Sequence, residues 1–453
     1  MQDKNIELIE KAPVHKAILT LALPTIFSSI ATLLYNLADT YFVGLLDDVY
    51  QLGAVSLAYP VFIIMQAIGS IFGIGVAPYI SRCLGAQKYD EVKKASSVTV
   101  YTSVIATFAL TALYFLFRTP ILSVLGTSEH TFMLTKKYLD IVVLFAVAMT
   151  LQTVLGSLLR AEGKANHAVI EMVIGTIVNI ILDPIFILPW GLNMGVVGAA
   201  IATIIGIVVA DIYCLVVLLK GKSSISLKIK DFKPSKRIYI EVFKIGVPAC
   251  AGQLLMSVTN AAFNNLAAGY GDHVISAYGV AGKMIYIALI VVNSYAGGYM
   301  PFAGYNLGAN RIDRVTASFK FTLITSSILS VLLLVPFVGL AKPFMGAFTT
   351  DQPTIDAGVL ILKTWAICIP FLGVQFTMMS TLQVFGQATR AMIVNIGRQS
   401  IFFFPFLYLF NSFGNLTGLF MTNPIADIVT TIVAIFLVIS PLRKLLKAAK
   451  EVA

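Results

Sequence analysis

Twelve long apolar runs follow one another along the chain, and they restrict its fold more than any other feature. Each run can cross a lipid bilayer, which takes roughly 17–25 residues of helix. The alternating strand patterns that a membrane β-barrel needs are missing. We therefore predict an all-α, polytopic membrane protein with spans near residues 17–45, 51–80, 95–117, 138–159, 166–189, 193–219, 245–268, 274–305, 318–341, 357–385, 391–410 and 416–440.

The composition agrees with a membrane protein. Of the 453 residues, 58% are hydrophobic and 12% charged, whereas soluble domains carry about 25% charged residues. The net charge of +10 would suggest nucleic-acid binding in a soluble protein, but here the basic residues follow the loops. The four cysteines lie in apolar segments without CxxC spacing, so we interpret them as small buried hydrophobic residues. A polar N-terminus and a long first apolar run argue against a cleavable signal.

The distribution of Lys and Arg predicts the orientation in the membrane. Most of the 32 basic residues fall in loops on the side of the N-terminus. The loops on the other side hold Arg118, Lys136, Lys137 and Lys342. Because cytoplasmic loops carry the excess of Lys and Arg, we expect a multi-pass plasma-membrane (inner-membrane) protein with both termini in the cytoplasm.

An internal repeat divides the chain into two halves. Leu84-Gly-Ala-Gln-Lys-Tyr-Asp90 recurs as Leu307-Gly-Ala-Asn-Arg-Ile-Asp313 after a shift of about 223 residues. The same shift relates Gly163 to Gly386, Ala168 to Ala391, Pro24 to Pro248 and Asn36 to Asn260, with small insertions. We predict two pseudo-symmetric six-helix lobes, residues 1–219 and 245–453, joined by a basic cytoplasmic loop, residues 220–244. Paired halves of this kind are a transporter architecture with the substrate site at their interface.

The first span contains an acid, Asp39, with Tyr35 and Asn36 on the same helix face. An acid at this depth costs roughly 2.5–3.5 kcal/mol on insertion scales and is a functional candidate by default. The alternative is that Asp39 reaches the outer interface, because Gly44 lies only five residues further on.

The fifth span contains a second acid, in Asn179-Ile-Ile-Leu-Asp183-Pro184. Asn179 and Asp183 share a face, and Pro184 leaves the carbonyl of Ile180 without its helical partner. Tyr138, at the expected start of the fourth span, and Thr203, in the third turn of the sixth, fall at a similar depth. The repeat places Phe263 opposite Asp39 and Phe406 opposite Asp183, so we assign ion coupling to the N-terminal half alone.

Two neighbouring carboxylates in a low dielectric do not both ionise, so such a pair can take up and release a proton. A Na⁺ ion held by oxygens of Asp39, Asn179, Asp183 and Thr203 is the competing interpretation. A polar network that only fixes helix packing is the third. The sequence therefore predicts H⁺ or Na⁺ as coupling ion, no organic cofactor and no resident metal.

Other polar and methionine residues within the spans give weaker signals. Arg398 and Asp427 are a candidate structural ion pair, and Asp211 is expected near the inner membrane interface. Flexible methionine side chains suit a cavity for varied apolar ligands. Candidate cavity residues are Gln66, Met65, Met256, Lys283, Met284 and Asn260. HExxH, Walker and GxSxG motifs are missing, which argues against an enzyme.

At this point the chain resembles the multidrug and toxic compound extrusion (MATE) transporters over nearly its whole length. The resemblance rests on Pro24 with Tyr35-Asn36…Asp39…Phe42-Val43-Gly44, on the two Leu-Gly-Ala repeats, on Asn179…Asp183-Pro184, and on Pro424-Ile-Ala-Asp427. It implies two six-helix lobes and cation-coupled drug efflux by alternating access. It further implies coupling residues at Asp39, Tyr138, Asn179, Asp183 and Thr203, as in the bacterial branch with N-lobe acids. Another branch has an acidic site on helices 7 and 10, where this sequence has no acid.

We therefore expect an antiporter and not an enzyme. It would export lipophilic or cationic compounds in exchange for H⁺ or Na⁺ and work as a monomer, without nucleic acid. One alternative is a lipid-linked oligosaccharide flippase on the same scaffold, which predicts a more cationic cavity than Lys283 and Arg398 supply. The other is a receptor or scaffold that transports nothing, in which Asp39→Asn would leave drug resistance intact.

Overall fold

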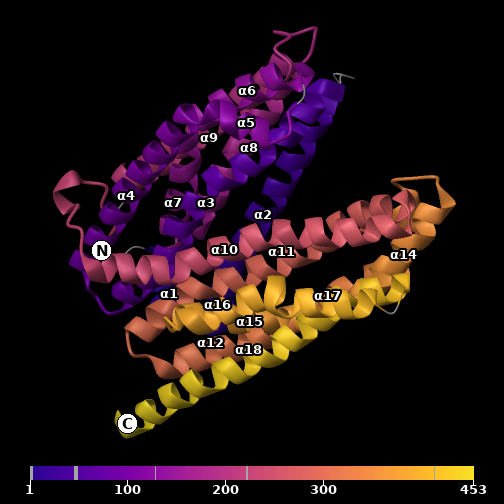
Figure 1. Ribbon diagram of the computed structural model, residues 1–453. Coiled ribbons are helices and arrows are strands. Elements are labelled where there is room, and N and C mark those ends of the chain that lie inside the picture. The colour runs from indigo at the N-terminus through magenta and orange to yellow at the C-terminus, as the bar shows by residue number, and fades with distance from the viewer. Residues whose placement is uncertain (1–3, 45–48, 128, 221–222, 413, 453) are drawn as a thin grey trace. The chain divides into compact units, whose positions relative to one another are not determined.

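The computed structural model describes residues 4–44, 49–127, 129–220, 223–412 and 414–452, which are almost entirely helical and contain no strand (Figure 1). Within these helices, the side chains of residues 4–6, 34–41, 43, 44, 49, 52, 56, 257, 261, 268, 272 and 448–452 are outside the description.

The first half of the chain forms nine α-helices. They are α1 (Lys4–Lys11), α2 (Val14–Gly44), α3 (Val49–Gly85), α4 (Tyr89–Leu116), α5 (Arg118–Val124), α6 (Glu129–Leu144), α7 (Ala146–Ala161), α8 (Ala165–Ile187) and α9 (Val196–Lys220). The 3₁₀ turn η1 (Ile229–Asp231) lies in the connection to the second half.

The second half begins with α10 (Lys236–Ala267). It continues with η2 (Ala268–Tyr270), α11 (Asp272–Gly308), α12 (Ile312–Gly339), α13 (Ala341–Gly346), α14 (Gln352–Ala366), α15 (Ile369–Val384), α16 (Ala388–Ile396), the π-helix η3 (Gly397–Ile401), α17 (Phe403–Asn411) and α18 (Leu416–Val452). The seventh predicted span therefore starts at Lys236 and not near residue 245, because the helix extends nine residues into the basic segment.

Ten helical segments of the described chain are long and apolar enough to cross a membrane. Two further spans are bent helix pairs, α6 with α7 at 47° and α14 with α15 at 49°. Counting each pair as one span gives the twelve helices predicted from the sequence. Pro370 lies in the first turn of α15 and cannot donate a backbone hydrogen bond, which favours the second break.

The internal repeat is visible in the backbone as well. Gln87 and Asn310, at matching places after the two Leu-Gly-Ala motifs, both have a φ of 57°. Gly163 and Gly386, the matched glycines of the second motif, have φ values of 82° and 67°. A left-handed residue ends a helix and is rare for a side chain such as glutamine. The two halves therefore end these helices with the same backbone conformation, in addition to having similar sequences.

The helices group into two compact units. We call residues 27–246, with the first seven residues, the N lobe, and residues 8–26 with 247–453 the C lobe. The grouping differs from a division of the chain near residue 220 in two respects. The first part of α2 packs within the C lobe, and the first part of α10 packs within the N lobe.

Close backbone contacts explain this grouping. In the N lobe, Gly75 of α3 faces the backbone of Val242, and Gly246 faces that of Ile71, with no room for a Cβ atom at either glycine. Arg82 also donates to Glu241 at 2.7 Å. In the C lobe, Gly298 of α11 meets the backbone of Ala22 of α2 in the same way. The repeat has thus kept one type of glycine crossing in both lobes.

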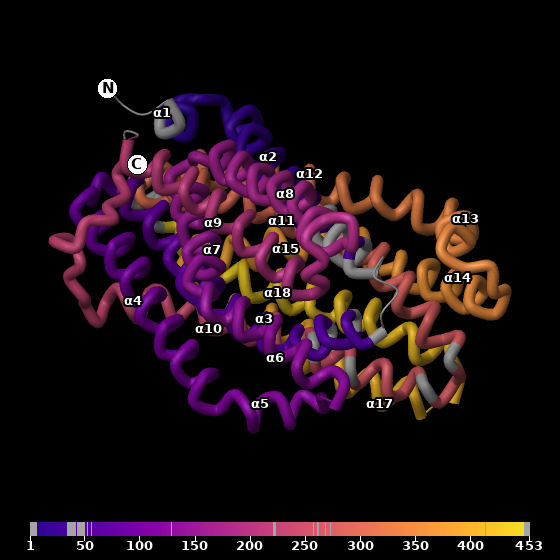
Figure 2. The backbone as a smooth tube through the Cα atoms, turned by 90° about the horizontal axis from the view of Figure 1, so that it is seen from above, coloured from indigo at the N-terminus to yellow at the C-terminus, as the bar shows by residue number. Residues whose placement is uncertain are grey.

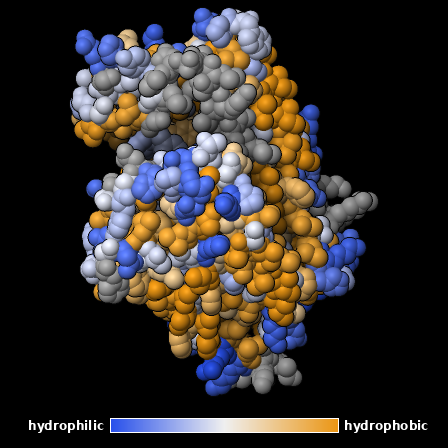
Figure 3. All heavy atoms as spheres, turned by 90° about the vertical axis from the view of Figure 1, so that its right-hand side faces the viewer, coloured by the Kyte–Doolittle hydropathy of each residue, from blue (hydrophilic) through white to orange (hydrophobic). Residues whose placement is uncertain are grey.

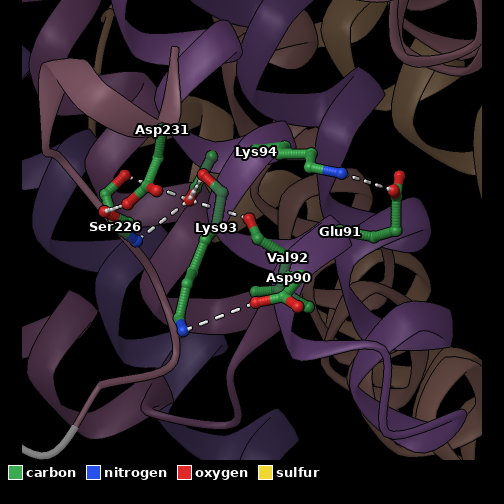
Figure 4. A network of polar contacts seen from close by, with 8 residues as sticks. Asp90, Glu91, Val92, Lys93, Lys94, Ser226 and Asp231 are labelled. Carbon is green, nitrogen blue, oxygen red and sulfur yellow. Dashed lines mark hydrogen bonds and ion pairs between the residues drawn. The ribbon is translucent and has the colours of Figure 1, made fainter. Parts of the chain in front are cut away.

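The segment between α9 and α10 is fixed to the N lobe by serine and acid side chains (Figure 4). The Ser96 hydroxyl of α4 donates to the Ser226 carbonyl at 3.1 Å and accepts from the Ser226 N–H at 3.0 Å. Ser226 in turn donates to Asp231 at 2.5 Å, beside the Lys93–Asp90 pair on the first turns of α4. Glu162, after α7, accepts from the Ser223 hydroxyl at 2.8 Å.

The outer surface agrees with a lipid environment. Apolar side chains form broad continuous areas in Figure 3, with hydrophilic side chains gathered at their margins. Large exposed apolar residues include Phe108 and Leu116 of α4 and Leu332 and Val335 of α12. Lipid tails solvate such residues as well as a protein core does, so they need no covering partner in a membrane.

Candidate functional site

The centre of the candidate site is one buried stripe on α8. The buried residues of this helix are Ala165, Ala168, Glu171, Gly175, Asn179, Asp183 and Ile187. Their spacing of three and then four residues keeps them on one face of the helix. Most of that face would be apolar in an ordinary membrane helix. Here three of its seven residues can hydrogen-bond, two of them as acids.

Two glycines let α9 approach this stripe closely. A Cβ atom on Gly175 would lie 3.2 Å from the carbonyl oxygen of Gly206, and one on Gly206 would lie 2.7 Å from that of Gly175. Figures 1 and 2 both show α8 and α9 side by side. Small residues at such crossings are typical of membrane helices packed backbone to backbone. The crossing brings Thr203 of α9 next to Asn179 of α8.

Asp183, Asn179 and Thr203 form a hydrogen-bonded group. The Asn179 side-chain amide donates to Asp183 Oδ1 at 3.0 Å and to Thr203 Oγ1 at 3.5 Å. Asp183 is 0% exposed, Asn179 1% and Thr203 5%. Among the described residues, Asn179 Oδ1 accepts no hydrogen bond. Carboxylate, amide and hydroxyl oxygens thus meet in a dry place, a set that can hold a proton or a hard cation.

Pro184 follows Asp183 directly and lies one turn before the end of α8 at Ile187. It has no N–H for the carbonyl of Ile180, as expected from the sequence. The helix then ends with the Leu188 N–H donating to the Pro184 carbonyl at 3.3 Å.

Tyr138 lies in the middle of α6, not in the first turn of the fourth span as predicted. The helix already begins at Glu129, because the polar residues before Tyr138 are helical too. Tyr138 is 8% exposed and packs in an apolar cluster with Met65 of α3 and with Ala199 and Ala200 of α9. Tyr138 of α6 therefore packs against α9, the helix that also carries Thr203.

Three predicted residues cannot be placed as side chains. Tyr35, Asn36 and Asp39 lie on α2, but their side chains are outside the described residues. The nearest described link between α2 and α8 is Thr32, whose hydroxyl donates to the Met172 sulfur at 3.3 Å. Pro24 lies inside α2, in the part that belongs to the C lobe.

The candidate cavity residues differ in their surroundings. Met65 is buried in the core of the N lobe, in the same cluster as Tyr138. Gln66, Lys283 and Asn260 are exposed, and Met256 and Met284 are half-buried. Asn260 accepts a hydrogen bond from the Tyr278 hydroxyl at 3.0 Å.

The C lobe has aromatic residues where the N lobe has acids. Phe263, opposite Asp39 in the repeat, is fully buried and stacks on Tyr278 with ring centroids 4.3 Å apart. Phe420 also stacks on Phe263, with ring centroids 6.2 Å apart, and the Trp365 ring meets Phe263 edge-on at a centroid distance of 6.4 Å. Phe406, opposite Asp183, is half-buried and stacks on Phe410 at 5.7 Å.

In the C lobe, the buried acid Asp427 is paired with the half-buried Arg398. Arg398 Nε donates to Asp427 Oδ1 at 2.5 Å, and the guanidinium lies 5.6 Å from the centre of the Phe376 ring. Arg398 belongs to the π-helix η3, whose extra residue per turn turns this side chain toward α18. The structure thus brings together the two residues that the sequence suggested as an ion pair.

A second acidic group of the N lobe was missed from the sequence. Glu171, on the stripe of α8, is 2% exposed. Asp211 of α9, expected near the membrane interface, is 6% exposed because α9 packs it toward α8. The four-residue spacing from Asp183 through Asn179 and Gly175 to Glu171 was the signal that could have revealed it.

The chain matches the MatE family model twice, over residues 24–185 and 248–409. It belongs to the MATE family of transporters. The two matches begin at Pro24 and Pro248, so the family model and the internal repeat divide the MATE chain in the same way. The family is one of transporters and not of enzymes, as the missing catalytic motifs predicted.

Individual relatives agree with this assignment. The MATE chain is 32% identical to the multidrug export protein MepA of Staphylococcus aureus strain MSSA476, over 97% of this chain and 96% of that protein. Among solved structures, a MATE in complex with MaL6 superposes with a TM-score of 0.92 at 23% identity, covering 98% of this chain and all of that one. An outward-facing multidrug resistance MATE transporter of the MOP superfamily gives 0.91 at 24% identity, covering 98% and 99%. The two-lobe MATE fold predicted from the sequence is confirmed.

Proposed function

We propose that this MATE transporter exports lipophilic, often cationic compounds from the cytoplasm, and that inward movement of protons drives the export. The observation that carries the proposal is Asp183, an acid with no exposed surface whose carboxylate accepts a hydrogen bond from the neutral amide of Asn179. An acid inside a membrane is costly and marks ion pathways in transporters. The named activity of the MepA relatives supports drug export.

Protonation supplies the coupling in this proposal. A carboxylate at this site favours a helix packing that offers it donors or a cation, whereas the neutral acid tolerates an apolar surrounding. A proton can therefore shift the balance between two conformations of the transporter, by as much as its binding differs between them. Asp39 would be the second exchangeable acid, with Asn179, Thr203 and Tyr138 tuning the site.

The orientation is part of the proposal. With the basic loops inside, both termini lie in the cytoplasm of a plasma membrane. Helices α2 and α8 then run from inside to outside. Asp183 comes near the outer end of α8, so its proton is taken from the outer side during the export cycle.

The test uses proteoliposomes that contain the purified full-length protein and a fluorescent lipophilic cation. A pH gradient and a Na⁺ gradient are imposed separately on the wild type, Asp39→Asn, Asp183→Asn and the control Asp90→Asn, whose side chain is exposed at the start of α4. We expect transport that follows the pH gradient in the wild type and the control, and falls to background in the two membrane-acid variants.

Three other results would each change the conclusion. Transport that follows only the Na⁺ gradient would keep the site but replace its ion. Transport unaffected by either gradient or by Asp183→Asn would contradict an ion-coupled exporter. Movement of a fluorescent lipid-linked sugar, with no movement of the cation, would favour the flippase alternative on the same scaffold.

A further inference from the structure

A second buried group of charges lies on the same α8–α9 contact as the Asp183 site, three helical turns away along α8. Glu171 is twelve residues before Asp183 on the buried stripe, which corresponds to about 18 Å of helix. Asp211 of α9 directly follows Ala210, whose Cβ atom lies 3.3 Å from the position of a Cβ atom on Gly175, one helical turn from Glu171. The group is therefore separate from Asp183, although both sit between the same two helices.

Arg160, near the end of α7, is the cation of this group. A Cβ atom on Gly156 would lie 3.0 Å from Glu171 Oε2 and 3.5 Å from Arg160 Nη1. The carboxylate and the guanidinium thus lie side by side over one glycine of α7, which leaves the room they need. Arg160 Nη2 also donates to the Ser157 hydroxyl at 3.1 Å.

Both acids have a carboxyl oxygen without a hydrogen-bond partner in the described part of the chain. Glu171 is 2% exposed and Asp211 6%, so neither is solvated by bulk water. Among the described residues, Glu171 Oε1 and Asp211 Oδ1 have no hydrogen-bond partner. Buried oxygens of this kind are uncommon, because leaving one without a partner costs about 1–3 kcal/mol.

Among the residues that the structure describes, the remaining neighbours carry no second positive charge to offset these acids. From α9, Cys214 is fully buried beside Glu171. One turn nearer the inner end, His167 of α8 is hydrogen-bonded to the Tyr213 hydroxyl of α9 at 2.8 Å. After α7, the buried Lys164 is paired with Glu162 at 3.0 Å. From α2, the described contact with this part of α8 is the neutral pair Thr32 and Met172.

Two carboxyl groups are therefore buried on one helix contact, and Arg160 beside Glu171 is the guanidinium that the described residues place there. One carboxylate balances Arg160, and a second one would remain as an uncompensated charge, which a protein interior does not tolerate. We propose that Glu171 and Asp211 form a second proton-binding site, in which one proton is held between the two carboxyl groups and supplies the hydrogen bond that their free oxygens lack.

A proton fits this site better than a metal cation. Hard cations take about six oxygen ligands, whereas the described residues offer the two free carboxyl oxygens. The adjacent guanidinium would also repel a cation. A proton needs one donor oxygen and one acceptor oxygen, which this pair supplies. With the basic loops inside, the site lies in the inner half of the membrane, on the side opposite to Asp183.

This proposal rests on the proposed function. A proton taken up at Asp183 could pass next to the Glu171–Asp211 site in the inner half of the membrane. Its test needs no gradient and no substrate. The stretching band of protonated carboxylic acids is recorded by infrared spectroscopy on the full-length protein in lipid, at neutral pH, for Glu171→Gln, Asp211→Asn, the double variant, and Arg160→Gln. The control is Asp140→Asn, which removes an acid paired with Arg118 at 2.9 Å.

We expect each single acid variant to lose one carboxylic-acid component, because the acid that remains ionises beside Arg160. The double variant should lose no more than either single variant, since only one proton is shared. Arg160→Gln should gain a component, as both acids are then neutral, and Asp140→Asn should change nothing. Thermal unfolding of each variant shows whether it is folded.

Two results would overturn the second site. An unchanged band in both folded single variants would mean that both acids are ionised. A wild-type band that falls when Na⁺ is added, and no longer does so in Asp211→Asn, would mean that the pair binds Na⁺ and not a proton. Loss of the Glu171–Asp211 component with transport insensitive to pH would keep the second site and reject the proposed coupling.

Discussion

The two lobes are built from the same repeat, yet they fill matching positions with opposite chemistry. In the N lobe, α8 and α9 enclose Asp183, Asn179 and Thr203 in a hydrogen-bonded group. In the C lobe, the positions opposite the two predicted coupling acids hold Phe263 and Phe406, and Phe263 is packed among aromatic rings. The shared features, the helix ends and the glycine crossings, are what a scaffold needs. We proposed above that the polar group of the N lobe couples transport to protons, and the aromatic residues of the C lobe offer a comparison that tests this.

The strongest way to break this comparison is to put an acid into the aromatic cluster. Phe263→Asp should destabilise the C lobe by about 5 kcal/mol, because it removes a buried ring and leaves a carboxyl group without donors. Thermal unfolding in detergent measures the loss. Phe263→Leu, which keeps the site apolar, should lose much less. If Phe263→Asp were as stable as the wild type, the C lobe could accept an acid as well as the N lobe does.

The Arg398–Asp427 pair sharpens the comparison. Among the described residues of the C lobe, Asp427 is the one buried acid that is paired with an arginine. Arg398→Met should cost about 3–5 kcal/mol, because Asp427 is then a buried charge without its partner. The double variant Arg398→Met with Asp427→Leu should recover most of that stability, and it should still transport. Loss of transport in a double variant of wild-type stability would show that the pair takes part in function.

A smaller effect tests the close approach of α8 and α9. Gly206→Ala places a methyl group 2.7 Å from the Gly175 carbonyl and should destabilise the N lobe by about 1–3 kcal/mol. Gly297→Ala is the matched control in the C lobe, because no atom lies within 4 Å of its Cβ position. There the substitution should be neutral or stabilising by up to about 1 kcal/mol. Equal melting temperatures for the two variants would mean that α8 and α9 can separate without cost.

The smallest expected effect lies outside the membrane. Asp351 caps α14, and hydrogen bonds from the Thr354 hydroxyl and N–H hold the pKa of its carboxyl below the usual value of 3.8. A lowered folded-state pKa stabilises the fold above pH 3.8 and loses that contribution as the pH falls below it. Asp351→Ala should therefore melt slightly below the wild type at pH 7, and the difference should shrink at pH 3. A difference that grows on acidification would contradict this capping role.

Much of this arrangement could be predicted from the sequence. The features that could not be predicted depend on how helices distant in the sequence pack together. Apolar length predicts twelve spans, and the repeat predicts two lobes. The spacing of Asn179 and Asp183 predicts their shared face. The burial of Asp211 could not be predicted from its own helix, because it depends on the packing of α9 against α8. Tyr138 was predicted at a helix start because the residues before it are polar, yet those residues belong to the same helix.

The mixed membership of α2 has a consequence for how the protein is made. Residues 8–26 are synthesised well before their partners in the C lobe. Gly298 faces Ala22, and Arg314 donates to the carbonyls of Ile9 and Ala12 at 3.0 and 2.8 Å. The first part of α2 therefore lies in the bilayer without its C-lobe partners until about two thirds of the chain has been synthesised. A chain cut at the connecting loop would therefore yield two pieces that each lack a strip of their own core, and each would be rescued only by synthesis of the other in the same cell.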